Sequence, residues 1–196
     1  MKKVSTTLVD GLKERIATSI SMYESLGLVL PGTNYTDLVQ ALFGCIKDHP
    51  QDVWVYVTVT RPFESFVKMF GDLSRYPNVT FIDCISRASG IARRDDQCMY
   101  IESPTMLEKV TMELNNIFAD APGGAGKYLI LDSLTTLMIY NDPALVTEFF
   151  YQLLNKTRAD GVHSISLAVE EGETDKYINK LIYLNDKIIK VRDTFI

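Results

Sequence analysis

Two short segments of the sequence carry residue types that can hold phosphate and magnesium. The first, residues 32–36, follows an apolar run over 26–30 and precedes a helical pattern over 36–47. Backbone N–H groups at such a strand-to-helix turn, together with the helix dipole, can bind a phosphate group. The second segment ends a later apolar run with an acid, which can hold a magnesium ion through water. The candidate binding residues are Gly32, Thr33, Asn34, Tyr35, Thr36, Asp132 and Ser133, with Asp132 as the candidate magnesium ligand.

Short apolar runs alternate with helical patterns along the chain, and this alternation predicts the elements that position the two segments. Helices are expected over 8–23 and 36–47, from Pro62, Pro104 and Pro143 onward, and near 175–184. The expected strands cover residues 26–30, 53–59, 79–83, 98–101, 128–132, 165–169 and 187–191. This order predicts an α/β fold with a mostly parallel sheet covered by helices on both faces. Ligands bind such sheets at the carboxyl ends of the strands, where both candidate segments lie.

Length and composition fit one domain. The chain has 196 residues, of which 46% are hydrophobic and 23% charged. A domain of this size buries roughly 70% of the surface that its unfolded chain exposes. We therefore expect a single domain over 1–196, with a lead helix within 1–25 and an exposed polar loop over 86–97.

Charge and side-chain chemistry exclude several classes of protein. The formal net charge of −5 argues against nucleic acid as a partner, because phosphate backbones are bound by clustered cations. The sequence has no signal-peptide pattern and no run of roughly 18 apolar residues that would span a membrane. Cys45, Cys84, Cys98, His49 and His163 lack the spacing of a disulfide framework or a zinc site. These features predict a cytoplasmic protein without membrane contact, whose cysteines are buried and reduced.

The order of the motifs resembles that of KaiC-like members of the RecA superfamily. The stretch Tyr128–Leu134 is similar to the family's Walker B strand with its Asp-Ser ending, and Val29–Thr33 stands where the family carries its phosphate loop. Tyr56–Val59 with the Pro62 helix, and the helix–strand pair that ends at Val169, also fall in the family's order. The resemblance spans roughly residues 26–191. It implies a three-layer RecA-like P-loop-type fold and an ancestral ATPase site.

The chain departs from the family at the residues that hydrolysis needs. A working phosphate loop reads G-x-x-x-x-G-K-[ST], and the resemblance places Asn34 and Tyr35 where its Gly-Lys belongs. Loss of the glycine prevents close approach to phosphate, and loss of the lysine removes a cation from the transferring group. The family's acidic pair after the second strand corresponds here to Thr60-Arg61. Thr36 and Asp132 alone keep the pattern, and the resemblance makes the Thr36 hydroxyl the second candidate magnesium ligand. It therefore implies a pseudo-ATPase with a degenerate Walker A motif.

Several of these residues also have a purely structural interpretation. Asp132 can serve as a hydrogen-bond acceptor at a strand end without any ligand, and Thr33, Asn34 and Thr36 are residue types that cap helices. Gly126-Lys127 imitates the end of a phosphate loop, but it leads into a strand rather than a helix and lacks the following Ser or Thr. We therefore do not expect a phosphate site at residues 121–128.

Three functions are compatible with the sequence. The first is a non-catalytic KaiC/RecA-like module that acts in protein interaction or regulation. It would bind a protein partner or associate with itself through the loop 86–97, the lead helix or the face by which KaiC-like relatives assemble. The second is a nucleotide-binding switch or weak ATPase that holds ATP or ADP with magnesium through residues 32–36 and Asp132, with Arg61 as a substitute cation. The third is an enzyme that uses the same crevice for another small ligand, and nothing in the sequence names that ligand.

Overall fold

The fold is built on one seven-stranded sheet. The computed structural model describes residues 2–91, 94–170 and 176–191, and the side chains within them except those of 2–7 and 176. The sheet runs in the order β4-β3-β2-β5-β6-β1-β7, and every pairing between these strands is parallel. The strands are β1 (Ser25–Pro31), β2 (Val53–Thr58), β3 (Val79–Asp83), β4 (Cys98–Tyr100), β5 (Lys127–Asp132), β6 (Val162–Glu170) and β7 (Lys187–Lys190). The expected parallel α/β sheet is confirmed.

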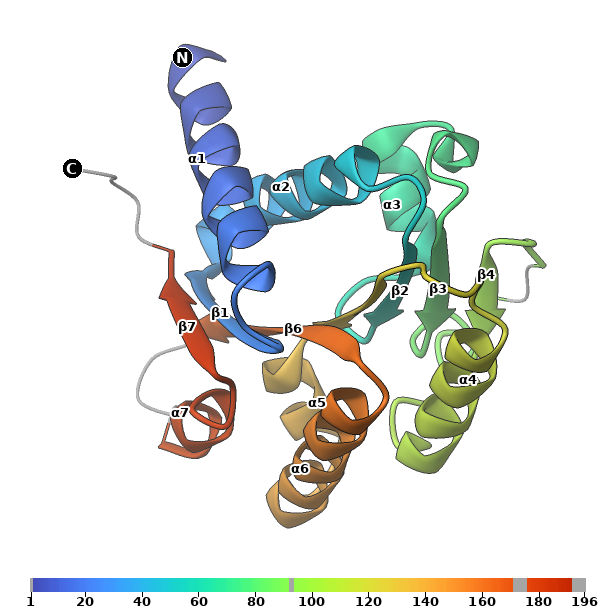
Figure 1. Ribbon diagram of the computed structural model, residues 1–196. Helices are drawn as coiled ribbons and strands as arrows, with labels where there is room; N and C mark the ends of the chain where they lie inside the picture. The colour runs from blue at the N-terminus through green and yellow to red at the C-terminus, as the bar shows by residue number, and fades with distance from the viewer. Residues whose placement is uncertain (1, 92–93, 171–175, 192–196) are drawn as a thin grey trace.

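Helices cover both faces of the sheet and give three layers (Figure 1). The helices on one face are α1 (Lys2–Ile20), α2 (Tyr35–Asp48) and α3 (Phe63–Phe70). Those on the other face are α4 (Leu107–Ala119), α5 (Leu134–Tyr140), α6 (Pro143–Ala159) and α7 (Lys176–Ile182). Two single turns of 3-10 helix, η1 (Gly32–Asn34) and η2 (Leu73–Arg75), complete the described helical segments.

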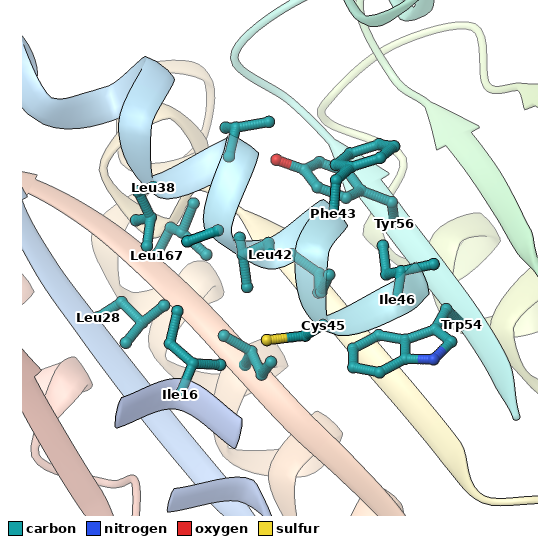
Figure 2. Close-up of a cluster of buried hydrophobic side chains, with 14 of the residues drawn as sticks. Ile16, Leu28, Leu38, Leu42, Phe43, Cys45, Ile46, Trp54, Tyr56 and Leu167 are labelled. Carbon is teal, nitrogen blue, oxygen red and sulfur yellow. The ribbon is translucent and has the colours of Figure 1, made fainter. Parts of the chain in front are cut away.

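The central strands are buried on both sides, which is why they read as continuous apolar runs. Along β2, Trp54 and Tyr56 belong to the cluster under α1–α3, whereas Val55 and Val57 belong to the cluster under α4–α7. Figure 2 shows part of the first cluster, where the side chains of α2 lie against the sheet. Successive residues of a strand point to opposite faces, so one short segment serves two cores.

The lead helix is part of the core. Leu12 and Ile16 of α1 are fully buried, and α1 packs along α2. The ammonium of Lys13 forms an ion pair with Asp48 at the end of α2, at 2.6 Å. Much of α1 is therefore already engaged within the domain, which reduces the surface that the expected interaction through this helix could use.

One local expectation was wrong, and one helix was missed. The helix expected from Ser103-Pro104 begins at Leu107, because Ser103 Oγ accepts from the Thr105 N–H (3.2 Å) and holds a separate turn. The short helix α5 was not expected at all, since its seven residues are too few for an apolar stripe to emerge. The expected start of α6 is confirmed, because Asp142 Oδ1 accepts from the Ala144 N–H at 2.8 Å. Gly161 follows α6 with a φ of 66°, a conformation that favours glycine.

The loop over 86–97 is largely exposed in its described residues, as expected, although Ser86 itself is buried. Residues 92–93 lie outside the described part of the chain. Cys45, Cys84 and Cys98 are buried and unpaired, as expected. Across the described residues, no helix combines the length and the apolar character that crossing a membrane requires.

Candidate functional site

The carboxyl ends of β1, β2 and β5 bring the predicted site residues toward one place. Asp132 ends β5, which lies between β2 and β6, and β6 separates it from β1. Tyr35 opens α2, which follows β1 after the turn η1, and its hydroxyl donates a hydrogen bond to Asp132 Oδ2. The structure therefore joins one residue from each of the two candidate segments, 97 positions apart in the sequence.

The carboxylate of Asp132 is fully buried and bonded to three hydroxyl groups. Besides Tyr35, the Tyr56 hydroxyl donates to Oδ2 at 2.7 Å and the Thr60 hydroxyl donates to Oδ1 at 3.0 Å. These donors come from α2, β2 and the loop after β2. Two of these donors bond to Oδ2 and one to Oδ1, so both carboxylate oxygens already accept hydrogen bonds within the protein.

Burial dominates the electrostatics of this carboxyl group. Desolvation raises the pKa of Asp132 more than the hydrogen bonds from Tyr35, Tyr56 and Thr60 and the charge of Arg61 lower it. Burial, followed by the nearby carboxylate, also raises the pKa of both tyrosines well above the usual range. The tyrosines therefore stay neutral and remain hydrogen-bond donors at physiological pH.

Ser133 has a structural role in this arrangement. Its hydroxyl accepts from the Thr136 N–H (3.3 Å) and so caps the start of α5. The same hydroxyl lies 3.0 Å from Thr136 Oγ1 and 3.3 Å from Thr60 Oγ1. The peptide bond between Asp132 and Ser133 is cis. We name the following residues the hydroxyl cluster: Tyr35, Tyr56, Thr60, Asp132, Ser133 and Thr136.

The segment expected to cradle phosphate is short. Strand β1 continues to Pro31, which pairs with Glu170, and α2 begins at Tyr35. Only the single turn of η1 separates them. A phosphate loop needs a longer run of free backbone N–H groups between strand and helix. The strand thus occupies residues that the resemblance assigned to the loop.

The other residues of the turn divide into exposed and buried. Gly32, Thr33 and Thr36 are exposed, whereas Asn34 is buried and accepts from the Thr33 hydroxyl at 3.2 Å. Asn34 makes no side-chain capping bond to α2, so its expected role as a helix cap is not borne out. Thr36, the candidate magnesium ligand, is not among the donors to Asp132. Tyr35 is the one residue of the segment whose side chain joins the hydroxyl cluster.

Arg61 stands beside this cluster. Its guanidinium carbon lies 4.4 Å from the centre of the Tyr35 ring. The Arg61 carbonyl accepts from the Thr58 hydroxyl, which fixes the chain after β2. The arginine therefore lies over the tyrosine ring and adds a cation–π contact.

Sequence reasoning missed Tyr56 as a site residue and gave Thr60 only an indirect role. A tyrosine within a buried strand needs a partner for its hydroxyl, and this requirement was the available signal. Asp83, at the end of β3, is a second buried acid. Its carboxylate accepts from the N–H groups of Phe63, Ile85 and Ser86 and from the Ser86 hydroxyl, at 2.6 to 2.8 Å. Asp83 thus anchors α3 and the following turn.

The segment that imitates a phosphate loop makes structural contacts. The Gly126 N–H donates to Asp52 Oδ1 at 2.9 Å, and Lys127 begins β5. A Cβ at Gly126 would lie 3.0 Å from the Asp52 carboxyl group, so glycine allows the close approach of this loop.

Two solved proteins of Pyrococcus horikoshii have a similar fold. The uncharacterized protein PH0321, in complex with an unknown peptide, gives a TM-score of 0.66 at 13% identity over 88% of this chain and 79% of that chain. The KaiC-like protein PH0186 gives a TM-score of 0.55 at 14% identity over 88% of this chain and 74% of that chain. A scan against protein-family models and a search of curated proteins each found no match. The expected three-layer KaiC/RecA-like fold is confirmed; at these identities the similarity establishes the fold alone.

Proposed function

We propose that this chain is a non-hydrolysing KaiC/RecA-like module that acts by binding another protein. The observation that carries the proposal is the hydrogen bond between Tyr35 and the fully buried carboxylate of Asp132. Tyr35, which stands at the lysine position of the motif, thereby bonds to the carboxylate of Asp132, which stands at the magnesium position. Stabilisation of a transferring phosphoryl group needs a cation and a metal at these two places.

Further features support the loss of hydrolysis. Strand β1 extends into the segment where a phosphate loop would lie, and the positions of the water-activating acids hold Thr60 and Arg61. The crystal structure of PH0321, which has a similar fold, contains an unknown peptide. A fold of this type that holds a peptide supports a protein-binding role for the present chain, although fold does not by itself define function.

The test is titration of the purified protein with ATP and ADP, with and without magnesium, combined with an assay of phosphate release. We expect no saturable binding at millimolar nucleotide and no release above that of the Asp132→Asn variant. Binding that needs magnesium and is weakened by Asp132→Ala would overturn the proposal. A Tyr35→Ala variant shows whether the tyrosine alone closes the site: gain of binding implicates its side chain, and no gain implicates the extended strand.

The second candidate is a nucleotide-binding switch, and the position of Arg61 favours it. A guanidinium beside Tyr35 would lie next to the phosphates of a nucleotide if the tyrosine moved outward. Gly32, Thr33 and Thr36 are exposed on the same turn. This candidate requires that Arg61→Ala weaken nucleotide affinity; an unchanged affinity in the same titration excludes it.

A further inference from the structure

A groove lies between α4 and α6. Figure 1 shows these two helices on the face of the sheet opposite α1–α3. The volume of the groove is about 730 Å³, within the usual range of ligand pockets. The first half of α4 and the first half of α6 form its walls, and Asn141 lies at the end of α5 beside it. The groove is separate from the hydroxyl cluster.

The groove has an apolar lining that the domain itself leaves open. Met106, Met112 and Leu145 line it with 40%, 51% and 57% of their surface exposed, whereas Phe149 lies deeper. Single exposed apolar residues are common on protein surfaces, but several that line one groove indicate a binding site. Methionine side chains are flexible and polarizable, and they adapt to the shape of a partner.

The charges beside this lining are acidic. Glu108 and Glu148 line the groove, and neither forms an ion pair with another residue in the described ranges. Lys109, the basic residue of the lining, is bound to Glu102 at 2.7 Å. Two carboxylates without a cation therefore flank an apolar surface, which favours a partner that carries basic side chains.

The walls favour a helix as the occupant. The lining residues come from two helices and the turns at their ends, whose backbone groups are largely bonded within those helices. An extended peptide would find no open strand edge there, whereas a third helix can pack its apolar face between two others. A second copy of this chain is disfavoured, because a two-fold contact would place the acidic surface against itself.

We propose that the groove between α4 and α6 binds an amphipathic helix of a partner protein, with apolar residues on one face and lysine or arginine residues beside them. This proposal rests on the proposed function and supplies the class of partner. Helix α5 connects the two regions: Ser133 caps its start within the hydroxyl cluster, and Asn141 follows its end at the groove. Asn141 Nδ2 donates to the Pro104 carbonyl at 3.2 Å and to the Leu137 carbonyl at 3.0 Å, which fixes this end against the turn before α4.

The probe is an idealised amphipathic peptide of leucine and lysine, of roughly 18 residues or five helical turns, with a leucine–glutamate peptide of the same pattern as its counterpart. Binding of the labelled peptides to the full chain is followed by fluorescence anisotropy. We expect the lysine peptide to bind at least about 10-fold more tightly than the glutamate peptide. Leu145→Asp should weaken the lysine peptide by about 10-fold or more, and the double variant E108K/E148K should reverse the preference.

Matched controls separate the groove from the overall charge. The double variant E14K/E24K makes the same change in net charge at exposed positions of α1 and of the turn before β1, and Met22→Asp places an acid at another exposed apolar residue. Both should leave the affinity unchanged, and circular dichroism verifies that each variant is folded. If E14K/E24K and E108K/E148K have equal effects on affinity, or if the lysine peptide does not bind, the proposal that the groove binds a basic helix is overturned. If the protein hydrolysed ATP and the lysine peptide still bound at the groove, only the proposed loss of hydrolysis would be overturned, and the groove proposal would stand.

Discussion

At the scale of single residues, Asp132 is the most consequential side chain of the candidate site. It is a fully buried acid with three hydroxyl partners. Three neutral donors compensate a buried charge incompletely, and burial therefore raises the pKa of Asp132 above its ordinary value of 3.8. The residue that could have served as a magnesium ligand is thus held in surroundings that disfavour its charge.

This pKa shift predicts how stability depends on pH. The folded state holds the Asp132 proton more tightly than the unfolded chain, so folding takes up a proton between pH 3.8 and the raised pKa. The contribution of Asp132 to stability is therefore complete below 3.8 and is lost as the pH rises through the folded pKa. Relative to Asp132→Asn, the wild-type free energy of unfolding should fall as the pH rises from about 4 through the raised pKa. Urea titrations of both proteins across this range measure the difference, in which the other carboxylates cancel, and a constant difference would contradict the raised pKa.

At the scale of elements, three segments far apart in the sequence meet at the amino end of β1. The Asp186 carboxylate accepts from the N–H and the hydroxyl of the fully buried Ser25, both at 2.9 Å. Arg158 near the end of α6 donates to Asp186 at 2.9 Å and to the Leu184 carbonyl at 3.1 Å. Burial alone would raise the pKa of Asp186, but the bonds from Ser25 and Arg158 lower it. These bonds connect β1, α6 and the turn before β7.

Removal of the Asp186 carboxylate should destabilise the fold. Asp186→Ala leaves the buried Ser25 N–H without its acceptor, which costs about 1–3 kcal/mol. Arg158→Ala should cost less, because Asp186 still accepts from Ser25 and a partly exposed ion pair contributes little. Since the folded pKa is lowered, the difference between wild type and Asp186→Ala should shrink as the pH falls below about 4. Urea denaturation of both variants checks the order, and a larger effect of Arg158→Ala would contradict it.

The sequence predicted the elements better than the contacts between them. All seven strands were expected close to their observed bounds, because buried parallel strands leave continuous apolar runs such as Val53–Thr58. Helix α5 escaped prediction because seven residues hold fewer than two turns of the helical period. The bond between Tyr35 and Asp132 could not be inferred from spacing, since it depends on how α2 and β5 pack. The sequence thus placed Tyr35 and Asp132 among the candidate residues but did not predict the hydrogen bond between them.

At the scale of the whole molecule, one sheet separates two cores. Trp54, the single tryptophan of the chain, is buried in the core under α1–α3, together with Ile16. Leu154 of α6 is buried in the core on the other face. Strand β2 contributes alternate residues to both cores, so loss of one core removes support from the other. This arrangement predicts that the chain unfolds as one cooperative unit, in keeping with the expected single domain.

A pair of substitutions tests whether the chain unfolds as one cooperative unit. Ile16→Ala and Leu154→Ala each remove buried methyl groups from a different core, and each should cost about 2–5 kcal/mol. Trp54 fluorescence reports on the core that contains Ile16, whereas far-ultraviolet circular dichroism reports on all helices. If the chain is one cooperative unit, Leu154→Ala shifts both urea transitions to the same lower midpoint, as Ile16→Ala does. If Leu154→Ala left the Trp54 transition in place while the dichroism changed, the two faces would unfold separately and the single-domain expectation would be wrong.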